Sequence, residues 1–366
     1  MAYNLEPSWW YDAQQMVWRE LSPRDLYDLR NPLIIDVRSP CEFEEERIPE
    51  AINFPLLSNE ERAQIGFLYK NQGELYARRY ALKFIAPKIP DIVDQILALR
   101  EHGNSVVIHC WRGGLRSEAV ASVLSIAGIP CLRLTGGYKA WRRMIVDDLT
   151  RDAYPFDPIV LYGNTGSGKT DILEELQRQG AQILDLELLA NHRGSTFGSI
   201  GKGKQPSQKN FEAALWSELR RFDRSQTVFL EAESRKIGKI ALPNLILEKI
   251  KKGHAVLVEG SMDKRIERIL STYWDCQNAD ATSALDEAFQ LLEFIKVRIG
   301  KKRCDDIRSL AAQGKLSDVV EILLSEYYDP LYRESTKHQQ NYLVTVSGDN
   351  PSASATELLK LSVTAQ

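Results

Sequence analysis

The sequence of 366 residues contains no long apolar run. Nothing in it approaches the roughly 18 consecutive apolar residues of a membrane-spanning helix. The opening MAYNLEPSWWYDAQQ has neither the basic nor the apolar part of a secretion signal. We therefore predict a cytoplasmic protein without a membrane partner. The composition, with 43 % apolar and 27 % charged residues, is typical of globular domains.

Cysteine is also scarce, and the sequence has no CxxC pair. The cysteines number five, which is odd, and they are widely spaced, so the pattern indicates neither a disulfide framework nor a structural zinc site. We expect at most one or two of them to take part in chemistry. The five are Cys41, Cys110, Cys131, Cys276 and Cys304.

The chain lacks a strong overall charge, since its formal net charge is only −3. That total conceals one basic block. Residues 192–252 hold 13 Lys/Arg against 6 Asp/Glu, a net of +7, and the rest of the chain is acidic. Basic blocks attract polyanions. The alternative is a solvated loop and helix face without a ligand.

Short apolar runs alternate with amphipathic stretches through most of the chain, which predicts parallel α/β units. In the first 150 residues we expect strands at 33–38, 105–110 and 130–134 and a helix at 117–128. The two prolines of 152–158 indicate a linker or domain boundary.

A second α/β cycle follows this boundary. We expect its strands at 159–163, 181–186, 227–231 and 255–259, and a helix at 169–180. From about 262 to 330 the apolar spacing near 3.6 predicts helices, including 262–274, 283–300 and 316–328, before a last strand at 341–346.

The segment HCWRGGLRS (109–117) places Cys110 between a strand and a helix. Backbone amides of such a loop can point at the sulfur, and the helix N-terminus adds partial positive charge, so the thiolate is favoured. Arg112 and Arg116 can add further positive charge at the rim. The alternative is a small buried hydrophobe, which is our interpretation of Cys131.

This loop also fits the H-C-x5-R-S/T pattern of cysteine phosphatases, so two families compete for it. The upstream DVRSPCEFEEERIPEAINFP (36–55) resembles the rhodanese signature, and GGYKAW (136–141) resembles the segment that closes a rhodanese domain. Arg47 stands where that pattern usually has His, and Glu50 where it usually has Gly. We interpret Asp36 and Arg38 as a structural ion pair.

The segment GNTGSGKT matches the phosphate-loop pattern G-x4-G-K-S/T in full and lies between an apolar strand and a helix. Loop amides can hold a diphosphate, Lys169 can reach its terminal phosphate, and the Thr170 hydroxyl can hold magnesium. The partner acid of the loop is either Glu231 or Asp185. The predicted diphosphate-binding residues are Gly163, Asn164, Thr165, Gly166, Ser167, Gly168, Lys169 and Thr170.

The basic block lies within this second domain and suits an RNA backbone, with His192 and Phe197 able to stack on bases. The alternative is a loop that only closes over the diphosphate. For YYDPLYR (327–333) we favour helix-end packing. The predicted RNA-binding residues are His192, Arg193, Lys202, Lys204, Lys209, Arg235 and Lys236.

A rhodanese-like domain fused to a phosphate-loop domain with LANHRGSTFG (189–198) and ESRKIG (233–238) resembles the tRNA 2-selenouridine synthases. The resemblance implies a rhodanese-like parallel-sheet domain over 1–150 and a P-loop NTPase-like α/β domain over 151–270. It also implies a helical region over 271–366 that is associated with the second domain.

That family resemblance also implies the chemistry. The sulfur of wobble 2-thiouridine in tRNA would be geranylated from geranyl diphosphate, and selenium from selenophosphate would then replace the S-geranyl group. The implied catalytic residues are Cys110, Arg112, Arg116 and Lys169. Cys110 would act either as a selenopersulfide-like carrier or by engaging the selenium donor at the base. No covalently bound cofactor is implied, and magnesium would bind at Thr170 if it is present.

Three other functions compete with this one. The chain could be a rhodanese-type sulfurtransferase fused to an ATP-dependent kinase or adenylating domain, which steady ATP turnover without a prenyl diphosphate would favour. It could be a cysteine phosphatase. It could also be a noncatalytic RNA-binding module, in which Cys110 and Lys169 would be dispensable.

Overall fold

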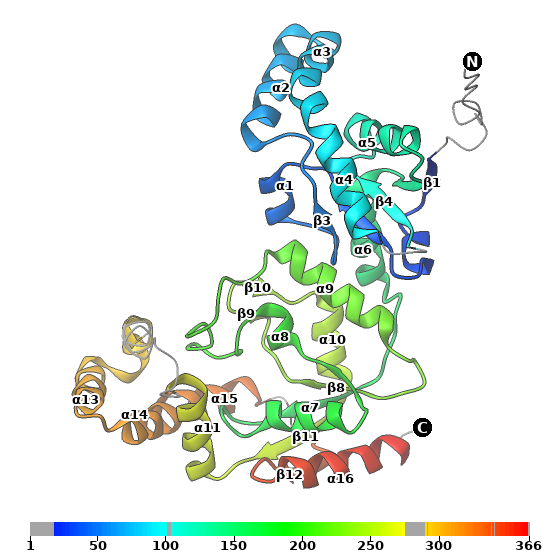
Figure 1. Cartoon of the computed structure of the whole chain (residues 1–366). Coiled ribbons are helices and arrows are strands. Elements are labelled where there is room, and N and C mark those ends of the chain that lie inside the picture. Colours follow the sequence, from blue (N-terminus) through cyan, green and yellow to red (C-terminus); the bar gives the residue numbers. More distant parts are fainter. Residues whose placement is uncertain are drawn as a thin grey trace, which may run out of the picture. The chain divides into compact units, whose positions relative to one another are not determined.

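The computed structural model describes residues 18–100, 104–274, 290, 292–337, 339 and 341–364. The chain forms two compact units, and the boundary between Asp148 and Leu149 falls inside helix α6 (Gly137–Arg151). Each unit contains a parallel five-stranded sheet (Figure 1). The predicted fold class, two α/β sheets followed by a helical C-terminal part, is therefore confirmed.

The sheet of the first unit has the strand order β1-β5-β4-β2-β3, with all neighbours parallel. Its strands are β1 (Arg19–Leu21), β2 (Leu33–Asp36), β3 (Ile52–Asn53), β4 (Val106–His109) and β5 (Cys131–Leu134). Short buried runs such as VVIH form β4 because a central parallel strand is covered on both faces. The helices before α6 are α1 (Pro40–Glu45), α2 (Asn59–Gln72), α3 (Glu74–Ile85), α4 (Ile89–Leu99) and α5 (Leu115–Ile126), and 3₁₀ turns span Asp25–Asp28 and Ala86–Lys88.

Helices α2 and α3, which follow β3 in the chain, pack on each other (Figure 1). A capping box starts α2, because Ser58 accepts a hydrogen bond from the Glu61 amide and Glu61 accepts one from the Ser58 amide. Gly73, with a φ of 86°, separates the two helices. Neither helix was predicted from the sequence.

Glu50 is a backbone exception in the turn before β3. Its φ of 66° lies in the left-handed region, which costs a residue with a Cβ about 1–2 kcal/mol. We expect Glu50→Gly to raise the free energy of unfolding by about 0.5–1 kcal/mol, because glycine adopts this φ without the steric cost. The Tm should rise by roughly 1–4 °C. Glu50→Ala keeps the Cβ and should give no gain; an equal Tm for both variants would contradict the argument.

The sheet of the second unit has the order β12-β11-β6-β8-β7, again with all neighbours parallel. Its strands are β6 (Pro158–Tyr162), β7 (Gln182–Leu184), β8 (Val228–Glu231), β11 (His254–Glu259) and β12 (Val344–Ser347). Helices α7 (Lys169–Arg178) and α16 (Pro351–Thr364) pack on each other, and both contribute to one apolar core cluster with these strands. The remaining elements before the helical part are α8 (Leu186–Ala190), α9 (Gln208–Arg221), α10 (Asn244–Lys252) and the antiparallel pair β9 (Lys236–Ile237) and β10 (Ile240–Ala241).

The helical part follows β11. It contains α11 (Met262–Trp274), α13 (Lys301–Ala312), α14 (Leu316–Leu323), the π-helical turn η4 (Leu324–Tyr328) and α15 (Asp329–Ser335). Residues 292–299 are helical as well, and the rest of the helix predicted at 283–300 falls largely outside the described residues. In the described part of the chain, no helix is long and apolar enough to cross a membrane.

Candidate functional site

Cys110 follows strand β4 directly and opens the loop that leads into helix α5. Its side chain is 3 % exposed. The Sγ atom lies 3.2 Å from Ser117 Oγ, a hydroxyl in the first turn of α5, and 3.8 Å from the carbonyl oxygen of Gly114. The structure therefore places the predicted thiol at the carboxyl end of a central strand, within hydrogen-bond reach of a hydroxyl.

Backbone hydrogen bonds join the segment GGYKAW (136–141) to this loop. The amide of Tyr138 donates to the Cys110 carbonyl at 2.9 Å, and that of Lys139 donates to the Trp111 carbonyl at 2.9 Å. Gly137 has a φ of 57°, and a Cβ there would come within 2.3 Å of the Cys110 carbonyl oxygen. Any side chain at this position would displace the cysteine loop, so the glycine fixes the position of Cys110.

The two arginines of the loop differ in their surroundings. Arg112 is exposed. Arg116 forms an ion pair with Glu42, with Nη1 2.7 Å from a carboxylate oxygen. Burial favours the neutral form of Glu42, but the hydrogen bond and charge of Arg116 outweigh it and lower the pKa of Glu42 to about 2. Part of the Arg116 charge is therefore already paired beside the loop.

Asp36 and Arg38 form a fully buried ion pair at 2.7 Å, which confirms the structural role expected for them. The Arg38 guanidinium also lies over the Tyr138 ring, 4.3 Å from its centroid. His109 is fully buried, with Nε2 3.7 Å from Asp36, and desolvation lowers its pKa. These residues are buried in the first unit next to the cysteine loop.

The predicted diphosphate-binding residues 163–170 form the connection between β6 and α7. Lys169 is the first residue of α7, so the loop amides and the helix N-terminus lie together, as anion binding requires. Lys169 Nζ donates to the carbonyls of Gly163 at 2.9 Å and Asn164 at 3.4 Å. The ammonium group is therefore held across the loop.

Glu231 is the acidic residue that contacts the phosphate loop. Thr170 Oγ1 donates to Glu231 Oε1 at 2.7 Å, and Lys169 Nζ lies 4.0 Å from Glu231 Oε2. Asp185, the other candidate, caps helix α8 by accepting from the Leu188 amide at 2.8 Å. The choice that the sequence left open between these two acids is resolved in favour of Glu231.

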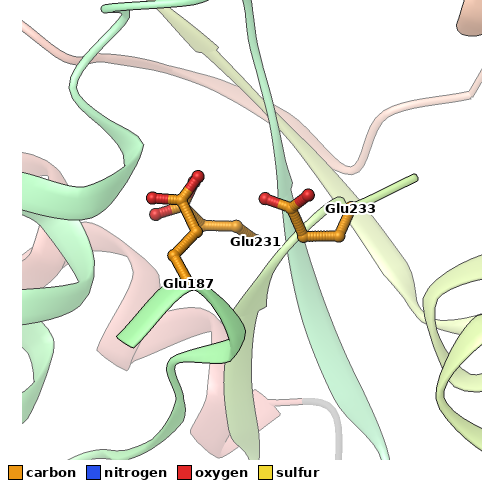
Figure 2. A group of neighbouring side chains, drawn as sticks. All are labelled: Glu187, Glu231 and Glu233. Atoms are coloured by element: carbon orange, nitrogen blue, oxygen red, sulfur yellow. The ribbon is translucent and has the colours of Figure 1, made fainter. Parts of the chain in front are cut away.

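Glu187 and Glu233 lie beside Glu231 (Figure 2). Glu187 was not predicted from the sequence, and Glu233 was noted only as part of the segment ESRKIG (233–238). One carboxylate oxygen from each of the three lies within 4.8 Å of the others. Burial and the charges of its neighbours raise the pKa of Glu187 to about 10 and that of Glu233 to about 7, although Lys169 opposes both shifts. Gly194 approaches this cluster closely, since a Cβ there would lie 2.3 Å from Glu187 Oε1.

The cluster makes the stability of the protein depend on pH. The pKa of Glu187 is 4.5 in the unfolded chain and rises to about 10 in the folded protein. Between these pH values the folded state therefore binds one proton that the unfolded state does not. Stability therefore falls as the pH rises through this window. Without added divalent metal, we expect Glu187→Gln to raise the Tm by at least about 2 °C more at pH 8.5 than at pH 5.5.

The matched control is Glu174→Gln, which removes an exposed carboxyl from α7 and should give the same small change at both pH values. A gain for Glu187→Gln that shrinks as the pH rises would contradict the burial of a protonated Glu187.

Parts of the predicted RNA-binding set lie together on the second unit. The Gln205 side chain donates to the Ile237 carbonyl at 3.1 Å and accepts from the Lys239 amide at 2.8 Å. The loop before α9 therefore lies beside the β9–β10 hairpin, and both segments carry basic residues of the predicted set. The exposed members are Lys204, Arg235 and Lys236, and the half-buried members are Lys202 and Lys209.

Three aromatic or basic residues of the same block point inward instead. His192 is 6 % exposed and Phe197 is 7 % exposed. Arg193 donates to the Ile200 carbonyl at 2.7 Å and lies over the Tyr273 ring, 4.9 Å from its centroid. The structure thus differs from the expected base stacking, because apolar burial and local bonds hold these side chains inside the loop.

Helix α11 supplies contacts to the phosphate loop that the sequence analysis missed. Arg265 Nε donates to the Thr165 carbonyl at 2.9 Å, and its other nitrogens pair with Asp329 of YYDPLYR at 2.6 and 3.0 Å. Arg268 Nη1 donates to the Gly166 carbonyl at 3.3 Å, and its Nε pairs with Asp171 at 2.6 Å. The two arginines are one helical turn apart, which is the only signal that the sequence offers.

Comparison with known proteins defines the class first. Residues 22–144 match the family model of the rhodanese-like domain, and residues 156–360 match that of the tRNA 2-selenouridine synthase AAA domain. The chain is thus a rhodanese-like domain joined to a phosphate-loop domain of the AAA type.

Curated relatives named tRNA 2-selenouridine synthase match both parts together. That of Shewanella pealeana is 35 % identical over 324 residues, 82 % of this chain and 87 % of the relative. That of Shewanella denitrificans is 34 % identical and covers 88 % and 93 %, and that of Pseudomonas fluorescens is 35 % identical and covers 85 % and 92 %. The chain belongs to the tRNA 2-selenouridine synthase family, as its motifs predicted.

Proposed function

We propose that the chain makes 2-selenouridine in tRNA by geranylating the sulfur of wobble 2-thiouridine and then exchanging the S-geranyl group for selenium. The observation that carries this proposal is the presence of two complete loops in one chain of this family. One presents a thiol at the end of β4, and the other presents a phosphate-binding loop at the start of α7. Each loop suits one half of the reaction.

In the first half, residues 163–170 bind the diphosphate of geranyl diphosphate, and Lys169 moves from the loop carbonyls to the terminal phosphate. The thiouridine sulfur forms a bond to the allylic carbon while the carbon–oxygen bond to diphosphate breaks, and the base releases its N3 proton to solvent. The loop amides and Lys169 stabilise the negative charge that the leaving diphosphate gains.

The same residues fit a magnesium ion. The Thr170 hydroxyl and the Glu231 carboxylate are hard oxygen donors that lie 2.7 Å apart beside the loop, which is the chemistry that magnesium prefers. When bound there, the ion would neutralise charge on the diphosphate. Glu231 and Thr170 would hold it.

In the second half, Cys110 engages the selenium donor, selenophosphate, at the geranylated base. Selenium has the same oxidation state in selenophosphate and in 2-selenouridine, so a selenopersulfide carrier would require an added oxidant, whereas direct exchange at the base does not. Selenium bonds to C2, geranylthiol leaves, and phosphate is released with the addition of water. We therefore favour action at the base over the carrier role.

The tRNA backbone is proposed to bind along the exposed basic residues of the second unit. Lys204, Arg235 and Lys236 are exposed on neighbouring segments, where they can contact phosphates. Backbone contacts position a nucleic acid without reading its sequence. His192, Arg193 and Phe197 hold the loop that carries this surface.

Mass spectrometry of tRNA nucleosides tests both halves. Incubation without selenophosphate should accumulate S-geranyl-2-thiouridine, and incubation without geranyl diphosphate should leave 2-thiouridine unchanged. Selenouridine formed without geranyl diphosphate would overturn the proposed order. Steady ATP turnover with no prenyl requirement would favour the sulfurtransferase–kinase alternative.

A further inference from the structure

The helical part of the second unit encloses an apolar cavity of about 640 Å³, counted with its open mouth. Its walls come from α11, α13, α14 and η4 and from the loop at residues 195–200. Among the described residues, no charged side chain lines it. Such a cavity suits a hydrocarbon and not a nucleotide base.

The cavity begins at the phosphate loop. Thr165, a residue of that loop, is part of its lining. Ile269 of α11 also lines it and fills the space beside Gly166, since a Cβ on Gly166 would lie 3.3 Å from Ile269 Cδ1. Because Arg265 and Arg268 of α11 bond the loop carbonyls, the wall and the phosphate site are held together. A ligand with a diphosphate head and an apolar tail can therefore occupy both.

Two of the polar side chains that line the cavity pair with each other. Ser195 Oγ lies 3.3 Å from the hydroxyl of Tyr273, and both residues line the cavity. The π-helical turn η4 supplies Leu324 and Tyr328 to the wall, and π-helical turns are rare and often occur at functional sites. Since the donors satisfy each other, the wall favours an apolar chain.

We propose that this cavity binds the hydrocarbon chain of an allylic diphosphate and limits its length, with helix α13 as the distal wall. The proposal rests on the proposed function, because it places the tail of the substrate whose head the phosphate loop holds. Helix α14 contacts both α11 and α13, and Figure 1 shows the three in succession away from α7. Ala311 of α13 lines the cavity, so a larger side chain there shortens it.

The test compares Ala311→Phe with Ala312→Phe in the full-length protein. Ala312 is the neighbouring residue on α13 and is exposed. Each variant receives thiouridine-containing tRNA with dimethylallyl, geranyl or farnesyl diphosphate, and the S-prenyl nucleosides are quantified. One methylene in an apolar pocket changes specificity by roughly 10–200-fold. Ala311→Phe should lower the ratio of geranyl to dimethylallyl transfer at least about 10-fold, and Ala312→Phe should match the wild type.

A second variant enlarges the cavity, in case Ala311→Phe does not fold. Leu316 of α14 is half-buried and lines the cavity. Leu316→Ala should raise the ratio of farnesyl to geranyl transfer at least about 5-fold, because the removed carbon atoms leave room for a longer chain. Unchanged ratios in both lining variants would overturn the chain-length proposal while leaving prenyl transfer itself established.

A binding measurement separates this proposal from the proposed function. Calorimetry with geranyl S-thiolodiphosphate, which is resistant to cleavage, and with inorganic diphosphate needs no catalysis. The wild type should bind the geranyl compound more tightly, and Ala311→Phe should lose at least about 10-fold of that affinity while its affinity for diphosphate stays the same. If this holds but no prenyl group is transferred, the cavity stands and the proposed function fails. Equal affinities of the wild type for both compounds would overturn the cavity proposal.

Discussion

Lys169→Ala should reduce the rate of geranyl transfer to 2-thiouridine by about 10²–10³-fold, the usual effect of removing one group that stabilises charge in a transition state. Lys169 Nζ already lies across the phosphate loop, 2.9 Å from the Gly163 carbonyl. In the proposed reaction it turns from this carbonyl to the bound diphosphate. A charge-assisted contact to phosphate is among the stronger hydrogen bonds in proteins. The measurement is the initial rate of S-geranyl nucleoside formation at saturating tRNA.

Two controls separate this effect from general damage. Lys251→Ala removes an exposed lysine from α10 of the same unit and should leave the rate unchanged. The Lys169→Ala protein should also convert tRNA that is already geranylated to the selenium form, because that step does not use the diphosphate. Full geranyl transfer by Lys169→Ala would contradict the proposal that the phosphate loop binds the prenyl diphosphate.

The sequence predicts both loops well because each lies in a local strand–loop–helix pattern. The strand expected at 105–110 is β4 at Val106–His109, and the helix expected at 169–180 is α7 at Lys169–Arg178. Glycines and apolar runs of a few residues determine such segments, so no distant contact is needed to recognise them. The predicted and observed ends of these two elements differ by at most two residues.

The acid that partners Thr170 could not be predicted, because it depends on strand order. Glu231 and Asp185 both follow short apolar strands in the sequence. In the sheet, β8 lies directly beside β6, with Glu231 opposite Leu161, whereas β7 lies one strand further out. Of these two strands, only β8 lies beside β6, and its Glu231 accepts the hydrogen bond from Thr170. Sequence periodicity carries no information about that neighbour.

The basic block shows a different limit. Composition correctly indicated exposed lysines such as Lys204 but gave no sign that His192 and Phe197 are buried. Phe197 belongs to an apolar cluster with Val319 and Leu323, more than a hundred residues later in the chain. The apolar cavity depends on the same distant packing. Helices in this part of the chain were predicted from the sequence, but the cavity between them depends on how they pack against one another.

The cysteine loop carries the second large expected effect. Cys110→Ser should leave geranyl transfer within about 2-fold of the wild type and reduce selenium incorporation by at least about 10²-fold, because the proposed exchange at the base uses the Cys110 thiol and a hydroxyl does not replace it. The S-geranyl nucleoside should accumulate when geranyl diphosphate and selenophosphate are both present. The readout is the time course of both nucleosides by mass spectrometry.

The other cysteines of the first unit provide the comparison for this test. Cys41 is exposed in the same unit, and Cys41→Ser should retain both activities. Cys131 is unsuitable as a reactive thiol because burial raises its pKa to about 11, well above that of a free cysteine. Since Cys110 is itself buried, an unchanged Tm and tRNA affinity are needed for the Cys110→Ser protein. Equal loss of both activities in such a protein would contradict the division of labour between the two loops, whereas accumulation of the geranylated base would place Cys110 after the prenyl transfer.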